Sequence, residues 1–472
     1  MALSLRRIRT RLGFSPVYAD RVAPTVTICI PAYRSEAFIQ DTLRSLFNQT
    51  YCDFIVEIAV EPPVEAVRSA CEPFLRDERL RIIDNPQVFG WAENIRSLLQ
   101  RVTTRYFAIL PHDDVLQPDY LATLIDKLMT RPEASVAYSD IVCFGHEAFR
   151  WSLHVKEEPI FDRLMSFFLA GAEADAFRGL THSRVLEHRQ FPTDEYEGFA
   201  VECEWVLYLL ISGTALHVPR PLYSKRFFGP RRIAASAKRL IGHSKEHLAD
   251  ALENHRSRML SLVRQADLPK TMTDAVTLAA EAAMLRRHMN FNMGQFLPVQ
   301  LARSEQILLS AGAMQDNYGK DIKAMCLLAL SQNAWVGGDH KMALDLAIAA
   351  VEANPHQWEA LAQLSKLQLN SNRGIEALDT AVRAWAIAPY ARGLRELIVD
   401  CESNIEHRFA EIMLSGQAAL LAERFDAAGY LIDNPDVAAA GVDPWKHYRE
   451  TGWREGRKFR SLPRMPLGLR MY

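Results

Sequence analysis

Two adjacent carboxylates, Asp113 and Asp114, have the residue type and position to bind a metal ion. They follow an apolar and aromatic run, Tyr106 to Leu110, which predicts a buried strand that ends at Pro111. Open α/β sheets place their ligands at the carboxyl ends of strands. Carboxylate oxygens are hard ligands for Mg²⁺ or Mn²⁺, and such an ion can hold a diphosphate. The alternative is that both residues only form a turn, a role that Asp commonly takes.

The composition is that of an ordinary globular protein with more than one domain. A chain of 472 residues, 49% hydrophobic and 24% charged, is too long for one typical core, so two or three domains are expected. The net charge of -2 gives no general reason to expect a nucleic-acid partner. Seven scattered cysteines without a Cys-x-x-Cys pair favour reduced thiols in a cytoplasmic protein over a disulfide framework or a zinc site.

No transmembrane segment is expected, because no apolar run approaches the roughly 20 residues that a spanning helix needs. Residues 1–22 contain five arginines, four of them at positions 6–11, but no hydrophobic region of signal-peptide length after these four. We interpret this segment as a basic N-terminal tail. The alternative is a weak peripheral contact with anionic lipid at the inner face of the cell membrane.

The elements around the two carboxylates alternate between strand and helix. Short β-branched or apolar runs, separated by amphipathic helical stretches, predict a mostly parallel sheet with helices on both faces. No Gly-x-Gly-x-x-Gly or P-loop motif follows any of these strands, so the dinucleotide and P-loop interpretations lose their main support. The strands are expected over 26–30, 54–60, 79–83 and 106–110.

Four segments in this order and spacing resemble the nucleotide-sugar half of the family 2 glycosyltransferases, which have the GT-A fold. The resemblance covers about residues 23–230. It rests on Val-Thr-Ile-Cys-Ile-Pro-Ala-Tyr at 26–33, Ser-Leu-Phe-Asn-Gln-Thr-Tyr at 45–51, Gly90 with Asn94, and Leu-Pro-His-Asp-Asp at 110–114.

The resemblance implies a role for each matching residue. Asp113 and Asp114 would hold a divalent cation, Mg²⁺ or Mn²⁺, that bridges the diphosphate of the sugar donor. Asn94 would flank the donor, with a simple helix-face hydrogen bond as its alternative. Two positions depart from the family: Glu61-Pro62-Pro63 replaces an acidic-acidic-Gly-Ser stretch, and Pro111 replaces a further Asp. The remaining expected nucleotide-sugar contacts are Pro31, Ala32, Tyr33, Glu61, Gly90, His112 and Asp113.

The segment 199–213 predicts a helix that ends at Gly213. It resembles the stretch in which the family places its catalytic base, and alignment on Trp205 puts that base at Glu202, with Glu204 as a second acid. An inverting transfer needs one carboxylate within hydrogen-bond reach of the acceptor hydroxyl. The alternative is that both acids only favour the start of the helix electrostatically.

The end of this domain resembles the family's Tyr-x-x-Arg-x-His stretch, matched by Tyr223 and Arg226. Phe228 stands where the family has a His, which removes a usual metal ligand. Arg226, together with Arg231 and Arg232, could instead meet the diphosphate. The variable residues 160–190 are where an acceptor would be met.

The second half of the chain is expected to be all-α. Residues 231–320 form a helical bundle, and residues 321–400 repeat with a period of 34, from Ala343 to Ala377 and from Pro355 to Pro389. This repeat resembles tetratricopeptide hairpins, which would bind a protein partner or serve as a scaffold or dimer contact. Residues 401–472 resemble a short helical module of bacterial glycosyltransferases, in which aromatic residues more often pack a small core than bind sugar.

Together these observations predict an α/β GT-A domain followed by an all-α region. The function that the resemblance implies is inverting transfer of a sugar from a nucleotide-sugar donor to a saccharide, lipid-linked or protein acceptor, in bacterial surface-polysaccharide synthesis. The alternative is a catalytically weakened domain that binds sugar or assembles proteins through its helical repeats.

Overall fold

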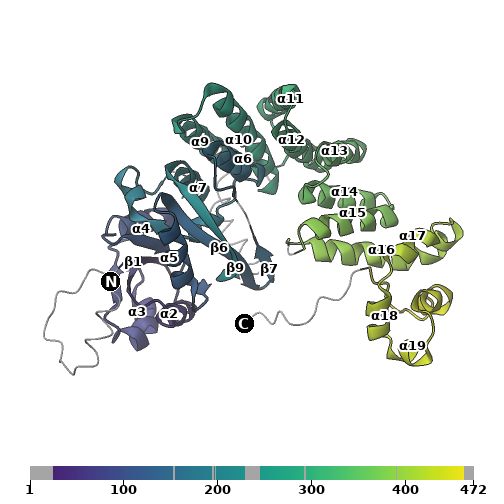
Figure 1. The fold of residues 1–472 in the computed structure, drawn as a ribbon, viewed down its shortest axis with the longest axis horizontal. Helices are drawn as coiled ribbons and strands as arrows, with labels where there is room; N and C mark the ends of the chain where they lie inside the picture. The colour runs from purple at the N-terminus through teal and green to yellow at the C-terminus, as the bar shows by residue number, and fades with distance from the viewer. Residues whose placement is uncertain are drawn as a thin grey trace.

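A mixed sheet occupies the first half of the chain and helices occupy the second half (Figure 1). The computed structural model describes residues 25–152, 155–193, 196, 198–228, 245–291, 294–389 and 391–461. The predicted basic tail, together with Arg231 and Arg232, lies outside the described residues.

The sheet has the strand order β3-β2-β1-β4-β8-β6-β9-β5, with β7 paired to β6. β1, β2, β3 and β4 pair in parallel, as predicted, whereas β8 runs antiparallel to β4 and β6. β9 runs parallel to β6 and antiparallel to β5. The bounds are β1 Val26–Ala32, β2 Phe54–Val60, β3 Leu80–Asp84, β4 Tyr106–Ile109, β5 Val115–Leu116, β6 Ala134–Gly145, β7 Phe149–Trp151, β8 Leu180–His182 and β9 Thr214–Phe227.

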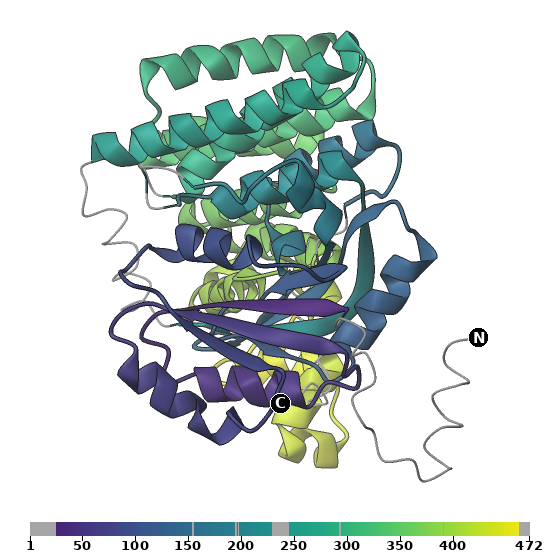
Figure 2. The same cartoon turned by 90° about the vertical axis from the view of Figure 1, so that its left-hand side faces the viewer.

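Helices cover both faces of this sheet (Figure 2). Alternate residues of a strand point to opposite faces, so Ile28 and Ile30 of β1 join the core beneath α2 and α5, whereas Cys29 joins the core beneath α4 and α7. The predicted α/β architecture is therefore confirmed. The helices of this half are α2 Ile39–Phe47, α3 Glu65–Cys71, α4 Trp91–Leu99, α5 Tyr120–Thr130, α6 Ile160–Leu169 and α7 Val201–Ser212.

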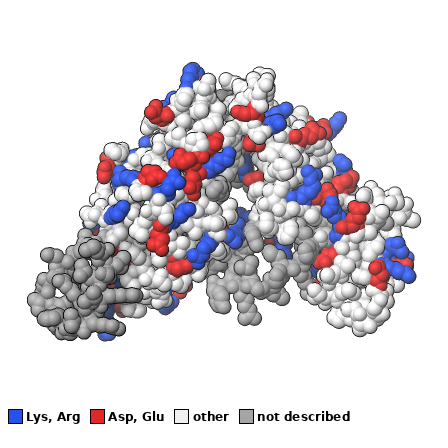
Figure 3. All heavy atoms as spheres, viewed as in Figure 1, with Lys and Arg blue, Asp and Glu red and all other residues white. Residues whose placement is uncertain are grey.

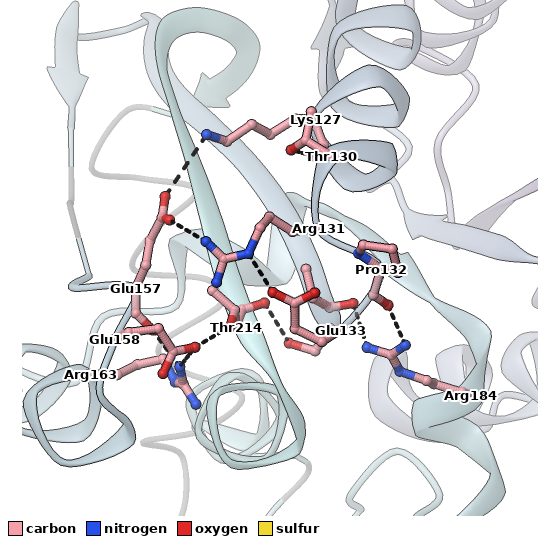
Figure 4. Close-up of polar contacts among 12 residues, drawn as sticks. Lys127, Thr130, Arg131, Pro132, Glu133, Glu157, Glu158, Arg163, Arg184 and Thr214 are labelled. Atoms are coloured by element: carbon pink, nitrogen blue, oxygen red, sulfur yellow. Dashed lines mark hydrogen bonds and ion pairs between the residues drawn. The ribbon is translucent and has the colours of Figure 1, made fainter.

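The end of α7 is fixed by a close backbone approach. α7 stops at Gly213, as predicted, but the backbone of Gly213 is extended, so a left-handed cap is not the reason. A Cβ at this position would lie 2.6 Å from the carbonyl oxygen of Glu133. Arg163 donates to the carbonyl of Leu210 and pairs with Glu158, which anchors the last turn of α7 to the loop before α6. Figure 4 shows the pair of Arg163 and Glu158 within a wider polar network that also joins α5, β6 and β9.

The predicted all-helical second half is confirmed. One hydrophobic core runs from the sheet face under α7 through α9, α10 and α11 into α12, so these helices pack directly on the α/β unit. The predicted domain boundary near residue 230 stays a prediction. The bounds are α9 Lys245–Gln265, α10 Lys270–Asn290, α11 Pro298–Ala313, α12 Asn317–Val336, α13 His340–Ala353, α14 Trp358–Asn370, α15 Gly374–Ile387, α16 Leu394–Leu414, α17 Ala418–Arg424, α18 Ala427–Asp433, α19 Pro435–Ala440 and α20 Pro444–His447.

The 34-residue period reappears as a repeated buried hydrogen bond. The hydroxyl of Ser331 in α12 donates to the carbonyl of Ala343 in α13 at 2.8 Å, and the hydroxyl of Ser365 in α14 donates to the carbonyl of Ala377 in α15 at 2.7 Å. Both serines are fully buried. The two helical hairpins therefore share one packing geometry, whereas their assignment as tetratricopeptide repeats stays a prediction.

The segment between α15 and α16 contacts the sheet of the first half. Arg392 forms a two-pronged ion pair with Glu147, which follows β6, at 2.6 and 3.0 Å. Its guanidinium also lies 4.7 Å from the ring centre of Phe227 at the end of β9. The curved helical array in Figure 1 is thus joined to the α/β unit at a second place.

The C-terminal segment packs around aromatic side chains. Tyr430, Tyr448 and Phe459 are fully buried, and Trp453 lies against Phe409 of α16. This arrangement supports the small-core interpretation of the segment. Among the helices that the structure describes, none combines the length and the apolar character needed to cross a membrane.

Candidate active site

The turn after β4 presents Asp113 and Asp114 at the carboxyl edge of the parallel strands, as predicted. Thr42 of α2 holds this turn from below, because its hydroxyl lies 2.9 Å from the carbonyl oxygen of His112 and 2.8 Å from that of Asp114. The ring Nδ1 of His112 lies 3.0 Å from the carbonyl oxygen of Pro31. The turn is therefore fixed to both α2 and β1.

Asp114 supports the turn from inside the protein. Its side chain is buried, and the Tyr223 hydroxyl donates to one carboxylate oxygen at 2.7 Å. The backbone N–H of Arg226 donates to the other oxygen at 2.9 Å. Burial raises the pKa of Asp114, and the nearby charge of Arg178 opposes that rise. Both oxygens are thus engaged by protein donors, which makes Asp114 a poorer metal ligand than predicted.

Asp113 is better placed to hold a cation. Its carboxylate makes no hydrogen bond to any residue that the structure describes, and its side chain is only half-buried. Within the described part of the chain, no three His, Cys, Asp or Glu side chains lie close enough together to hold a metal ion by themselves. A Mg²⁺ or Mn²⁺ ion that takes one carboxylate and completes its shell with substrate phosphates and water fits this donor set.

Glu202 lies in the first turn of α7, with one carboxylate oxygen buried and without a hydrogen-bond partner among the described residues. The 3₁₀ helix η2 (Asp175–Arg178) packs on α7, which carries Glu202, and its Arg178 lies 3.6 Å from the Asp114 carboxylate. One element thus contacts both the helix of the predicted base and the predicted metal-binding turn.

Glu204 does not share this position, which corrects its predicted catalytic role. Its side chain is buried, and it pairs with Arg189 and, at 3.2 Å, with Arg258 of α9. A carboxylate held between two arginines inside the protein is not accessible to a substrate. Glu204 instead joins α7 to the helices that follow the sheet.

Two predicted nucleotide contacts are engaged in structural hydrogen bonds. The amide of Asn94 is buried, donates to the carbonyl of Ala59 and accepts from Asn85, each at 3.1 Å, as its helix-face alternative describes. Glu61 is buried and accepts the backbone N–H of Phe89 at 3.1 Å. Burial raises the pKa of Glu61, and hydrogen bonds from the backbone of Phe89 and Gly90 oppose this rise. Both side chains thus hold the segment that leads into α4.

The remaining predicted contacts border the same edge of the sheet. Pro31 and Ala32 belong to β1 itself, so the predicted loop begins only at Tyr33, whose side chain is half-buried beneath Arg34. Gly90 adopts a positive φ of 84° directly before α4, a conformation that favours glycine.

Arg226 contacts the Asp113 turn and α2. The sequence predicts that this residue meets the diphosphate instead. Its Nε donates to the carbonyl of Asp113 at 3.2 Å, and Nη2 lies 3.2 Å from the carboxylate of Asp41 in α2. The guanidinium also lies 4.9 and 4.7 Å from the ring centres of Phe38 and Phe144. These contacts link β9, β6 and α2 around the turn.

Three charged residues of this region were not predicted: Asp175, Arg178 and Lys225. Asp175 and Arg178 lie on η2 (Asp175–Arg178), a short 3₁₀ helix that packs on β6 and α7. Burial raises the pKa of Asp175 to about 7, with the charge of Glu173 as the next cause. No motif marks Asp175 and Arg178, because they lie in the variable residues 160–190. Lys225 lies between the matched Tyr223 and Arg226, at a position to which that motif assigns no residue type.

Comparison with known proteins agrees with this geometry. Residues 27–181 match the model of the family described as glycosyl transferase family 2. Among curated relatives, glycosyltransferase GlyA of Streptococcus pneumoniae is 22% identical over 330 residues, which are 64% of this chain and 46% of the relative. The putative teichuronic acid biosynthesis glycosyltransferase TuaG of Bacillus subtilis is 26% identical over 109 residues, 23% of this chain and 43% of the relative.

The chain spans less than half the length of these curated relatives. Among solved structures, S. aureus TarS 1-349 in complex with UDP-GlcNAc is similar with a TM-score of 0.47 and 13% identity, covering 74% of this chain and 92% of that one. The region that matches the family model contains β1, the Asp113 turn and η2. Residues 27–181 are therefore similar to the glycosyl transferase family 2, and an all-helical region follows the sheet.

Proposed function

We propose that this protein is an inverting glycosyltransferase that transfers a sugar from a nucleotide-diphosphate donor to an acceptor hydroxyl. The observation that carries the proposal is the position of Asp113 and Glu202. Arg178 lies 3.6 Å from Asp114 of that turn, on η2, and η2 packs on α7. The first turn of α7 carries Glu202, which has one buried carboxylate oxygen without a donor among the described residues. This arrangement is expected when one acid holds the cation that binds the departing diphosphate and another acid accepts the proton of the acceptor hydroxyl.

Asp113 would hold Mg²⁺ or Mn²⁺, which supplies neutralisation of the negative charge that develops on the departing nucleoside diphosphate. Tyr223, Arg226 and Thr42 keep the Asp113 turn in place through the contacts described above. Asp114 fixes the turn to β9, because its carboxylate accepts a hydrogen bond from the Arg226 N–H.

Glu202 would accept the proton of the acceptor hydroxyl as that oxygen attacks the anomeric carbon of the donor. Direct displacement needs one base, whereas a retaining double displacement needs a second acid as nucleophile opposite the leaving group. The next acid along α7, Glu204, is occupied by Arg189 and Arg258. This supports inversion of configuration.

The TuaG relative is named for teichuronic acid biosynthesis, which supports a saccharide acceptor in bacterial surface-polysaccharide synthesis. A lipid-linked acceptor at the inner face of the membrane stays a prediction from the resemblance. The helical array would hold this acceptor or a protein partner. A second candidate, a domain that binds sugar without transfer, is favoured by Phe228, which replaces the expected His.

The two candidates differ in the effect of Glu202→Gln. If the protein is an enzyme, this variant binds UDP-, GDP- or dTDP-sugar with wild-type affinity but loses about 100-fold or more of its transfer rate. Glu187→Gln, at an exposed acid of the same domain, is the matched control and keeps its rate. A Glu202→Gln variant with unchanged transfer would contradict the assignment of the base.

A further inference from the structure

Arg178 and Lys225 are two cations with unused hydrogen-bond donors, although Arg178 also forms a 3.6 Å ion pair with Asp114. Neither donates a hydrogen bond from its side chain to any residue that the structure describes. Buried or half-buried cations usually pair with an acceptor, because desolvation of an unpaired charge is costly. Their arrangement therefore raises the question of which anion they bind.

Arg178 lies on η2 and packs against Tyr223, the residue whose hydroxyl donates to Asp114. Its Nε is 3.6 Å from the Asp114 carboxylate, beyond hydrogen-bond range, and is buried without a partner. The guanidinium lies 5.9 Å from the ring centre of Tyr223 and 5.8 Å from that of Phe177. Its side chain keeps 15% of its surface exposed. The aromatic rings thus fix a guanidinium whose donors are unused.

Lys225 lies two residues after Tyr223 on β9, so both side chains point to the same face of that strand. Its ammonium is 4.6 Å from the ring centre of Trp151 on β7. Burial and the charge of Arg178 lower the pKa of Lys225 to about 8. An anion bound between the two cations would accept hydrogen bonds from the donors that the described residues leave unused.

Arg178 lies 3.6 Å from Asp114, beside the metal-binding turn, and its helix η2 packs on α7, which carries Glu202. We propose that Arg178 and Lys225 form a subsite for a phosphate group of a substrate, between the Asp113 turn and Glu202. This inference rests on the proposed function. The phosphate has two sources in that reaction: the diphosphate of the donor, or an anionic acceptor.

Isothermal titration of the full chain with two probes, UDP in the presence of Mn²⁺ and inorganic phosphate, tests the subsite. Lys225→Gln and Arg178→Lys are compared with wild type, and Lys127→Gln, at a half-exposed lysine of α5, is the matched control. Lys225→Gln is the principal variant, because Arg178 also faces Asp114 and its replacement could disturb folding. Circular dichroism of each variant checks the fold.

Each result of these titrations either supports the proposed phosphate subsite or overturns it. If UDP blocks phosphate binding and Lys225→Gln binds UDP about tenfold more weakly, the subsite takes the donor diphosphate. If phosphate still binds the UDP-saturated protein, and Lys225→Gln loses about tenfold in phosphate affinity alone, the subsite takes an anionic acceptor. Affinities for both probes that match wild type in both variants would overturn the subsite.

The proposed function fails separately from the subsite. A wild-type protein that binds no nucleotide or nucleotide-sugar would contradict the transferase proposal. The phosphate titration of the free protein still decides whether Arg178 and Lys225 bind an anion. A wild-type protein that binds UDP but no phosphate, and whose variants bind UDP equally well, would overturn the subsite alone.

Discussion

The hydroxyl of Tyr223 donates a 2.7 Å hydrogen bond to the buried carboxylate of Asp114, across 109 residues of sequence. This bond joins β9, the last strand of the α/β unit, to the turn that carries Asp113. The next residues of β9 continue the contact, because the Arg226 N–H donates to the same carboxylate. The position of the Asp113 turn thus depends on the closing strand of the domain.

Tyr223→Phe should lower the free energy of unfolding by about 1–3 kcal/mol, because it leaves a buried carboxylate oxygen without its donor. The same change should weaken Mn²⁺-dependent nucleotide binding through the loosened turn. Urea unfolding and calorimetry measure the two effects. Wild-type stability in this variant would show that the hydrogen bond does not hold the turn.

The two acids of α7 should respond differently to the same change. Glu204→Gln should lower the free energy of unfolding by roughly 1–3 kcal/mol, because Arg189 and Arg258 lose their shared buried carboxylate. Glu202→Gln should cost clearly less, because its buried oxygen has no hydrogen-bond partner to lose. Thermal melts of both variants test this contrast, and an equal loss in both would remove the distinction between structural and catalytic acid.

Asp175→Asn should stabilise the protein at neutral and alkaline pH. Burial raises the pKa of Asp175 from its ordinary 3.8 to about 7, so its stabilising contribution is present below about pH 4 and is lost as the pH rises through 7. Over that window the wild type should lose stability relative to the variant by up to about 1.4 kcal/mol per pH unit. Urea unfolding between pH 5 and 8 measures the difference, and parallel pH profiles would contradict it.

The repeated hydrogen bond of the helical hairpins predicts matched effects at matched positions. Ser331→Ala and Ser365→Ala should each cost about 1 kcal/mol of unfolding free energy, because each leaves a buried carbonyl with one donor fewer. Ser371→Ala, at a partly exposed hydroxyl at the end of α14, serves as the control. Strongly unequal costs at Ser331 and Ser365 would contradict an equivalent packing of the two hairpins.

The sequence was sufficient for features that depend on local patterns. The strand before Pro111, the helix that ends at Gly213 and the 34-residue helical period all follow from residue type and spacing, and each is present in the structure. The position of Glu202 on the first turn of α7 also follows from its motif.

The sequence was insufficient where a role depends on which strands become neighbours. Asp114 and Asp113 are equivalent in sequence, and only the approach of β9 makes one of them internal. Glu204 matched a catalytic pattern, but its structural role depends on Arg258 from α9, more than 50 residues later. Arg178 of η2 lies 5.9 Å from the ring centre of Tyr223 on β9, two residues before Lys225, and no local pattern joins these two elements.

The central claim is that Asp113 anchors a cation-dependent nucleotide-sugar site. Calorimetric titration with UDP-, GDP- and dTDP-sugars, with and without Mn²⁺, on wild type and Asp113→Asn tests it most directly. The account predicts that at least one donor binds wild type with Mn²⁺, and that Asp113→Asn or removal of Mn²⁺ weakens this binding about tenfold or more. Donor binding that is absent from wild type, or equally tight without Mn²⁺ and without the Asp113 carboxylate, would contradict it.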